Sequence, residues 1–261
     1  MTATRLEIEY DGTELAGWAA QPGLRTVQGE LERALGIVRR RETRLTVGGR
    51  TDRGVHAVAQ VASYEGGPPD LRGVNAVLPR DVAVRAATVL DSAFDARRVA
   101  TSRTYCFRLH TRRTPSPFGR RQALWWPHRV DEERLRACAE TLVAAGEPDF
   151  TAFTPSRTEH VRFRRRVLHA AWRRQGEWLE FWIEADAFMR HMNRILVGTM
   201  LEVAAGRRTP EAFAALLEGA PRSAAGVTLP PEGLHLAGIA YPEAFGGPAL
   251  PPPGWGCAPW S

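Results

Sequence analysis

Strand-like and helix-like segments alternate along this chain without a regular strand–helix–strand spacing, and this irregular alternation restricts its fold more than any other feature. Short alternating or continuous apolar runs indicate strands, and apolar residues three and four positions apart indicate helices. The predicted strands cover residues 5–10, 44–47, 57–64, 81–89, 103–110, 167–172 and 178–184. The predicted helices cover residues 27–38, 71–77 and 188–204, with two more after Asp131 and Pro210. We therefore expect an α+β fold of two similar halves, each an antiparallel or mixed sheet with helices on one face.

The boundary between the two halves is expected near residue 100. Residues 1–100 are assigned to an N-terminal α+β half and residues 101–245 to a C-terminal α+β half. Residues 246–261 are rich in proline and glycine, which is typical of a loose tail.

The length and composition are those of a globular protein. The chain has 261 residues, 44% hydrophobic and 25% charged, so it is long enough for two compact halves and too apolar for a disordered chain. No segment approaches the roughly 20 consecutive apolar residues of a membrane helix, and the N-terminus lacks the apolar block of a signal peptide. We expect a soluble, cytoplasmic protein that does not enter a membrane.

The three cysteines, Cys106, Cys138 and Cys257, are far apart and form no CxxC pair. This spacing argues against a disulfide framework and against a zinc site, so each cysteine is interpreted as a small apolar filler.

The positive charge is carried by arginine alone and is clustered. The net charge is +6, and all 35 basic residues are arginines. Residues 96–130 hold nine arginines and no acidic residue, and residues 157–174 hold seven more beside a single glutamate. The guanidinium group suits phosphate, and clustered positive charge is a common footprint of a polyanionic partner. Such runs are also often solvated faces, so charge alone leaves nucleic acid and solvent about equally supported.

A glycine-flanked loop between two predicted strands is the strongest local candidate for chemistry. Residues 48–54 read Gly-Gly-Arg-Thr-Asp-Arg-Gly, and they lack the Lys-Ser/Thr ending of a phosphate-binding P-loop. The local pattern favours an ordinary turn around Asp52. The alternative is a carboxylate between Arg50 and Arg53, since neighbouring cations favour its ionised form and an oriented carboxylate can act as a nucleophile.

An ordered series of short motifs resembles the tRNA pseudouridine synthase A (TruA) family. Each motif is weak, but together they run in order through nearly the whole chain. They are Tyr10-Asp11-Gly12-Thr13, Gly17-Trp18, Thr26-Val27-Gln28, Gly49-Arg50-Thr51-Asp52-x-Gly54-Val55-His56-Ala57, Asn75-x-x-Leu78-Pro79, Phe94-x-Ala96-Arg97, Arg103-x-Tyr105, Asp149-Phe150, His191-Met192-x-Arg194, Gly233-Leu234-x-Leu236 and Tyr241-Pro242.

The resemblance implies a pseudouridine synthase fold whose two halves form one central cleft. It implies that Asp52 adds covalently to the target uridine, at C6 of the base or C1′ of the sugar, before the base is rejoined through carbon. It further implies tRNA as the partner, with uridines at positions 38–40 of the anticodon stem-loop as targets, and a homodimer. This isomerisation needs neither a metal nor a nucleotide cofactor.

Three further residues receive roles from the resemblance. Tyr105, which by pattern alone is an aromatic core residue, would stack on the target uracil and remove the C5 proton. Arg194, which by pattern alone is an exposed helix arginine beside a small Gly198, would form a salt bridge with Asp52. Arg50 would help to extrude the target base. We assign no acid or base role to His56 or His191.

The sequence departs from the family pattern at three places. Arg53 stands where alanine is usual, Asn193 stands where a small aliphatic residue is usual, and the glutamine that usually follows Trp18 is absent. Because Arg53 adjoins the expected nucleophile, it either adds positive charge to the pocket or points to solvent.

Two other classes of function remain as alternatives. An RNA-binding adaptor or chaperone without catalysis would use the same basic clusters, but it would not need Asp52, Tyr105 and Arg194 together. A small-molecule hydrolase would leave the arginines without a purpose, and the sequence shows no paired carboxylates or Ser-His-Asp set.

Overall fold

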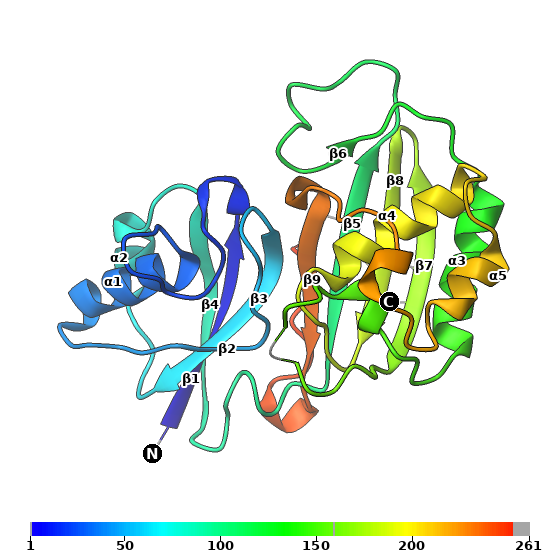
Figure 1. The fold of residues 1–261 in the computed structure, drawn as a ribbon. Coiled ribbons are helices and arrows are strands. Elements are labelled where there is room, and N and C mark those ends of the chain that lie inside the picture. The colour runs from blue at the N-terminus through cyan, green and yellow to red at the C-terminus, as the bar shows by residue number, and fades with distance from the viewer. Residues whose placement is uncertain (1, 159, 253–261) are drawn as a thin grey trace. The chain divides into compact units, whose positions relative to one another are not determined.

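The computed structural model describes residues 2–158 and 160–252, and these fold into two compact α+β units. The first unit contains residues 2–103 and 235–252, and the second contains residues 104–234. Each unit combines strands with helices, which confirms the expected α+β class (Figure 1). The described chain also contains five short 3-10 turns: η1 (Gly12–Glu14), η2 (Thr151–Phe153), η3 (Arg222–Ala224), η4 (Pro231–Gly233) and η5 (Glu243–Phe245).

The sheet of the first unit is built around one buried strand. Its strands are β1 (Thr2–Tyr10), β2 (Thr46–Val47), β3 (His56–Glu65), β4 (Val82–Asp91) and β9 (Leu234–Ala240). Strand β3 pairs antiparallel with β1 and β2 and parallel with β9, and β1 pairs antiparallel with β4. Almost every residue of β3 is buried, as expected for a strand with neighbours on both edges.

Two helices accompany the sheet of the first unit: α1 (Val27–Arg39) and α2 (Leu71–Val77). The hydroxyl of Thr26 accepts a hydrogen bond from the Gly29 nitrogen at 3.2 Å, so Thr26 caps α1 as predicted. The helix buries Val27, Leu31, Ala34 and Leu35 on one stripe. The two helices contact each other, and α2 packs against β4 (Figure 1).

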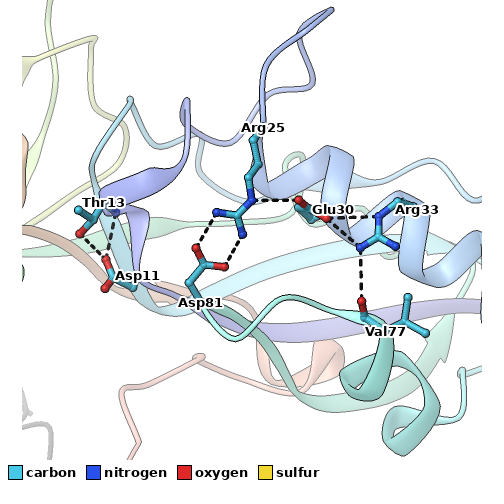
Figure 2. Close-up of polar contacts among 7 residues, drawn as sticks. All are labelled: Asp11, Thr13, Arg25, Glu30, Arg33, Val77 and Asp81. Atoms are coloured by element: carbon cyan, nitrogen blue, oxygen red, sulfur yellow. Dashed lines mark hydrogen bonds and ion pairs between the residues drawn. The ribbon is translucent and has the colours of Figure 1, made fainter.

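A surface network ties the segment before α1 to the start of β4. Arg25 donates two hydrogen bonds to Asp81, at 2.8 and 2.6 Å, and a third to Glu30 at 3.0 Å (Figure 2). Arg33 then links Glu30 to the carbonyl oxygen of Val77 at the end of α2 (Figure 2). These contacts fix both ends of the connection that precedes α1.

The second unit has a smaller sheet and three helices. Its strands are β5 (Ser102–His110), whose first two residues lie at the boundary, β6 (Leu124–Trp125), β7 (Val167–Gln175) and β8 (Trp178–Ala185). Its helices are α3 (Glu132–Ala144), α4 (Met192–Ala204) and α5 (Pro210–Ala215). The order is β5-β8-β7, with β6 parallel to β5 and the hairpin β7–β8 turning at Gly176. Helix α3, capped by Asp131 as predicted, packs along β7 and contacts α4 and α5.

Two predicted elements are shorter in the structure. The strand predicted at residues 44–47 covers only Thr46–Val47, because the Leu45 nitrogen donates to the Glu32 carboxylate at 2.9 Å rather than to a strand. The helix predicted at residues 188–204 begins at Met192. His191 has a left-handed backbone with φ 61°, and the ring of Phe188 packs edge-on against Tyr105 instead of joining the helical stripe.

The end of the described chain is attached, where the sequence predicted a loose tail. Ala249 is buried and pairs with Ile239 through two backbone hydrogen bonds of 2.9 and 3.2 Å. Arg5, itself buried, donates to the carbonyl oxygens of Phe245 and Gly247. The prediction of a loose segment is therefore wrong for residues 246–250, and its last residues, 253–261, lie outside the described chain.

The sequence did not predict β9, and this strand changes the division of the chain. Residues from His235 onward belong to the first unit, whereas the expected division assigned residues 101–245 to the C-terminal half. Six consecutive residues of β9 are buried, so the strand shows no alternation by which a period of two could be detected.

Candidate active site

Asp52 lies in a loop of the first unit, between β2 and β3, as the sequence predicted. We call residues 48–54 the Asp52 loop. Asp52 is half-buried, and the side chains of Arg50 and Arg53 on either side of Thr51 and Asp52 are exposed. The loop closes with a turn in which the Val55 nitrogen donates to the Asp52 carbonyl oxygen at 3.1 Å. The carboxylate is thus held at the surface of the unit beside two guanidinium-bearing residues.

The first residues of the Asp52 loop are anchored through their carbonyl oxygens. Arg103 donates from Nε and Nη2 to the Gly48 carbonyl oxygen, at 2.9 and 2.7 Å. Gln60, on the buried strand β3, donates to the Gly49 carbonyl oxygen at 2.6 Å. Two consecutive peptide groups are therefore fixed by side chains from distant parts of the sequence.

The segment around Gly17 lies directly against the peptide of Asp52. The Trp18 nitrogen donates to the Thr51 carbonyl oxygen at 3.0 Å. Gly17 has φ +98°, and a Cβ there would lie 2.9 Å from the Thr51 carbonyl oxygen and 3.2 Å from the Arg53 nitrogen. Only glycine accommodates both this backbone conformation and this close approach.

His56 follows the Asp52 loop and is buried among backbone and ring contacts. Its Nδ1 accepts a hydrogen bond from the Gly12 nitrogen at 3.0 Å, and its ring stacks on His235 with centroids 4.7 Å apart. The same Nδ1 lies 3.2 Å from the Asp11 carboxylate. One nitrogen cannot accept from Gly12 and donate to Asp11 at once, and we assign it as the acceptor because the amide is a fixed donor. These contacts suit the structural role that the sequence assigned to His56.

Tyr105 lies on β5 in the second unit, on a strand as predicted. The residue is 7% exposed, and its ring meets that of Phe188 edge-on, with centroids 4.9 Å apart and planes at 74°. Edge-to-face packing of this kind holds a ring in one orientation.

Arg194 lies in the first turn of α4 and is half-buried, so the pattern-based reading of an exposed helix arginine is wrong. Its Nε donates to the Leu229 carbonyl oxygen at 2.5 Å, which fixes the direction of the side chain. One turn later, a Cβ on Gly198 would collide with the carbonyl oxygen of Val227. The expected close approach of another backbone segment at Gly198 is confirmed.

The first arginine cluster contains an ordered, exposed loop in the second unit. We call residues 111–129 the arginine loop. Arg112 braces it by donating to the carbonyl oxygens of Thr114 and Pro115, at 2.8 and 3.0 Å. Four other arginines of the loop are exposed, and Phe118 is 96% exposed. The exposed arginines are Arg113, Arg120, Arg121 and Arg129. Such a surface combines phosphate-binding groups with an aromatic ring available for stacking.

The second arginine cluster mostly makes contacts within the chain. Arg174 forms an ion pair with Glu132, and Arg162 lies near the carboxylates of Glu147 and Asp186. Arg165 is 7% exposed, and burial lowers the pKa of its guanidinium. The two clusters, similar in sequence, are thus different surfaces.

The comparisons with known proteins agree with one another. The profile of a family described as tRNA pseudouridine synthase matches residues 143–242. The tRNA pseudouridine synthase A of Methylococcus capsulatus is 41% identical over 246 residues, covering 92% of this chain and 90% of that protein. The enzyme of the same name from Paraburkholderia phymatum is 38% identical over 266 residues, covering 100% of this chain and 98% of that protein. A third, from Burkholderia multivorans, is 40% identical over 261 residues, covering 98% of this chain and 95% of that protein.

This chain belongs to the tRNA pseudouridine synthase family. The family resemblance predicted from short motifs is confirmed by similarity along almost the full length of both sequences. The roles that the resemblance implies for Asp52, Tyr105, Arg194 and Arg50 remain predictions, and each of these residues is now located within its own unit.

Sequence reasoning missed the residues that hold the Asp52 loop of this family member. Gly17, Thr51 and Arg103 stood in the quoted motifs, but no role was assigned to them. Gln60 was not singled out, because a glutamine in an apolar strand has no recognisable spacing relative to the loop. A polar residue in a strand that is otherwise buried was the one available signal.

The described residues offer no other reactive centre of a familiar kind. No group of three or more His, Cys, Asp or Glu side chains among them is arranged to hold a metal ion. Cys106 and Cys138 are buried free thiols, as expected for apolar fillers, and burial raises the pKa of both, that of Cys138 to about 12. Cys257 lies outside the described residues. No helix in the described part of the chain is both long and apolar enough to cross a bilayer.

Proposed function

We propose that this protein isomerises uridine to pseudouridine in the anticodon stem-loop of tRNA, at positions 38–40. The observation that carries the proposal is the similarity to tRNA pseudouridine synthases over the full chain, with the GRTD sequence of the Asp52 loop intact. The exposed arginine loop supports a polyanionic substrate, because its guanidinium groups are available for phosphate.

Asp52 is the nucleophile in this proposal. Its carboxylate adds to C6 of the uracil or to C1′ of the ribose, and the bond between N1 and C1′ breaks. The base turns, a bond forms between C5 and C1′, the proton on C5 is lost, and N1 gains a proton, so the atoms balance without an oxidant or reductant. This chemistry calls for neither a metal nor a nucleotide cofactor. The anchored loop supports the role, since a nucleophile must be held in a defined position to react.

Three other side chains complete the proposed site in a cleft between two similar halves. Tyr105 stacks on the target uracil and takes the C5 proton, and its fixed ring orientation supports this role. Arg194 pairs with Asp52, and the bond from its Nε to Leu229 supports a fixed guanidinium at the start of α4. Arg50 is exposed beside the nucleophile and helps to extrude the base.

The assembly and location form part of the same proposal. We propose a homodimer that acts in the cytoplasm and holds one tRNA across both subunits. Sedimentation of the protein alone and with tRNA measures the stoichiometry directly.

The central experiment measures tritium release from tRNA labelled at uracil C5, together with sequencing-based mapping of pseudouridine. The wild-type protein is expected to release tritium and to modify the anticodon stem-loop. Asp52→Ala is expected to lose at least about 10³-fold in rate while tRNA binding is retained. Glu140→Gln, which removes one exposed carboxylate on α3, is the matched control and should react at the wild-type rate.

The alternative function is an RNA-binding adaptor or chaperone without catalysis. It predicts tight tRNA binding with no tritium release from the wild-type protein. An Asp52→Ala variant with full activity would instead remove Asp52 from the mechanism while leaving the enzyme class intact.

A further inference from the structure

Two buried polar side chains of the first unit are connected to the Asp52 loop and have no part in the proposed chemistry. Tyr10, at the end of β1, is 5% exposed, and Gln60, on β3, is fully buried. The Tyr10 hydroxyl lies 2.7 Å from the hydroxyl of Thr51, the residue directly before Asp52. Buried polar groups need partners, so this connection is a built feature of the core.

The hydrogen bonds of this network have a defined direction. The Oε1 atom of Gln60 accepts from the Val61 nitrogen at 3.1 Å, and its Nε2 donates to the Gly49 carbonyl oxygen at 2.6 Å, so the orientation of the amide is fixed. The second hydrogen on Nε2 is directed to the Tyr10 hydroxyl at 3.2 Å. Tyr10 therefore accepts from Gln60 and uses its single proton to donate to Thr51.

This direction is maintained across the working range of pH. Burial raises the pKa of Tyr10 to about 12, although hydrogen bonds from Thr51 and Gln60 oppose the rise. The phenol is consequently protonated at neutral pH, and it remains a donor to Thr51.

The network holds the peptide groups on both sides of Arg50. Gln60 fixes the Gly49 carbonyl oxygen, and Tyr10 fixes the Thr51 side chain. The Thr51 carbonyl oxygen is held separately by the Trp18 nitrogen. The chain entering Asp52 thus has no freedom to rotate without breaking a buried hydrogen bond.

Stability alone does not require these polar groups. Replacing both partners of a buried hydrogen bond by apolar groups of the same shape is often nearly neutral for folding. A phenylalanine at Tyr10 together with a valine at Thr51 would fill the same space. The polar network is therefore better explained by the position that it imposes on the loop.

We infer that Tyr10 and Gln60 are positioning residues that orient the Thr51–Asp52 peptide, so that the Asp52 carboxylate meets the target uridine. The inference rests on the proposed role of Asp52 as nucleophile. It adds two residues that act through Thr51 and the Gly49 carbonyl oxygen and do not touch the substrate.

The first experiment uses Tyr10→Phe, which removes one hydroxyl and keeps the ring. The single-turnover rate of tritium release should fall about 10- to 100-fold, the size of effect that a misplaced reacting group produces. The dissociation constant for tRNA should stay within about twofold, because no substrate contact is lost. Tyr64→Phe, which removes another tyrosine hydroxyl bond of the same unit, to Gly67, should react at the wild-type rate.

The second experiment acts on the other partner and does not depend on the first variant folding. Thr51→Val should lower the rate as Tyr10→Phe does, and Thr51→Ser, which restores the hydroxyl, should recover most of it. The double variant Tyr10→Phe/Thr51→Val should be no slower than the slower single variant, because both changes remove the same bond.

Two outcomes overturn the inference. One is a Tyr10→Phe or Thr51→Val protein that keeps the wild-type single-turnover rate. The other is a rate loss that matches the loss of folded protein in thermal unfolding, which would make the network purely structural. Failure of the proposed function has a different signature, since it appears as an inactive wild-type protein or an active Asp52→Ala variant.

Discussion

The Asp52 loop and the arginine loop are both glycine-containing, arginine-bearing connections, yet they are held in different ways. In the Asp52 loop, side chains or backbone groups from distant segments bind the peptide groups of Gly48, Gly49 and Thr51. In the arginine loop, the main braces come from its own residues, as in the bonds from Arg112 to Thr114 and Pro115. The difference follows from what each loop is proposed to do: covalent attack needs one position, whereas attraction of phosphate needs only charge within reach.

The two arginine clusters extend the lesson. Both look alike in sequence, but Arg174 and Arg162 of the second cluster lie near carboxylates of the chain, and Arg165 is buried. Only the first cluster presents a set of exposed arginines beside an exposed aromatic ring. Charge counted along a sequence therefore overstates the surface available to a polyanion.

The largest expected effect is that of Gly17→Ala. The new Cβ would lie 2.9 Å from the Thr51 carbonyl oxygen, at a backbone angle that alanine rarely adopts, so the Asp52 loop must shift. We expect tritium release to slow about 100-fold in single-turnover measurements. Gly67→Ala, at a glycine with open space around it, is the control and should be unaffected. A fully active Gly17→Ala protein would show that the Asp52 loop tolerates displacement, as the arginine loop should.

The next effect concerns alkaline pH, to which the buried network is sensitive and the arginine loop is not. The pKa of Tyr10 is raised to about 12 in the folded protein from an ordinary value of 10.0. The folded state thus favours the neutral phenol, and its contribution to stability is complete below pH 10 and is lost as the pH rises through 12. We expect Tyr10→Phe to lack a part of the alkaline loss worth about 2–3 kcal/mol, measured by denaturant unfolding. Equal pH profiles for wild type and variant would contradict this expectation.

Charge removal from the arginine loop should have a smaller effect on a different quantity. Arg113→Ala/Arg120→Ala is expected to weaken tRNA binding about 10-fold at moderate salt and to reduce the dependence of binding on salt by about one unit of slope per phosphate contact. The catalytic rate at saturating tRNA should be unchanged. Arg72→Ala/Arg80→Ala removes two exposed arginines of the first unit and serves as the control. A double variant in the arginine loop that matches this control would exclude the loop from tRNA binding.

The smallest effect is expected for the surface network in Figure 2. Arg25 forms a two-pronged pair with Asp81, but it is 37% exposed, so solvent screens the interaction. Arg25→Ala should lower the free energy of unfolding by less than about 1 kcal/mol, and the difference should shrink at high salt. A larger, salt-independent loss in denaturant unfolding would mean that this pair fixes the segment before α1 as firmly as buried bonds fix the Asp52 loop.

Local signals in the sequence predicted many of the elements. The bounds of α2, the caps at Thr26 and Asp131, and the turn at Gly176 agree with the structure, because each depends on residues close together in the chain. Prediction failed where a distant partner decided the conformation. The ring contact between Phe188 and Tyr105 accompanies the later start of α4, and the pairing of β3 with β9 brings residues from His235 onward into the first unit.

The candidate site divides in the same way. The sequence by itself determined that an aspartate stands in a glycine-flanked, arginine-bearing loop, and its ordered motifs identified the family. Only the tertiary structure decided that Tyr10, Gln60 and Arg103 hold that loop. The physical reason is that hydrogen bonds between distant strands depend on their register and on side-chain direction, which no local pattern of residues specifies.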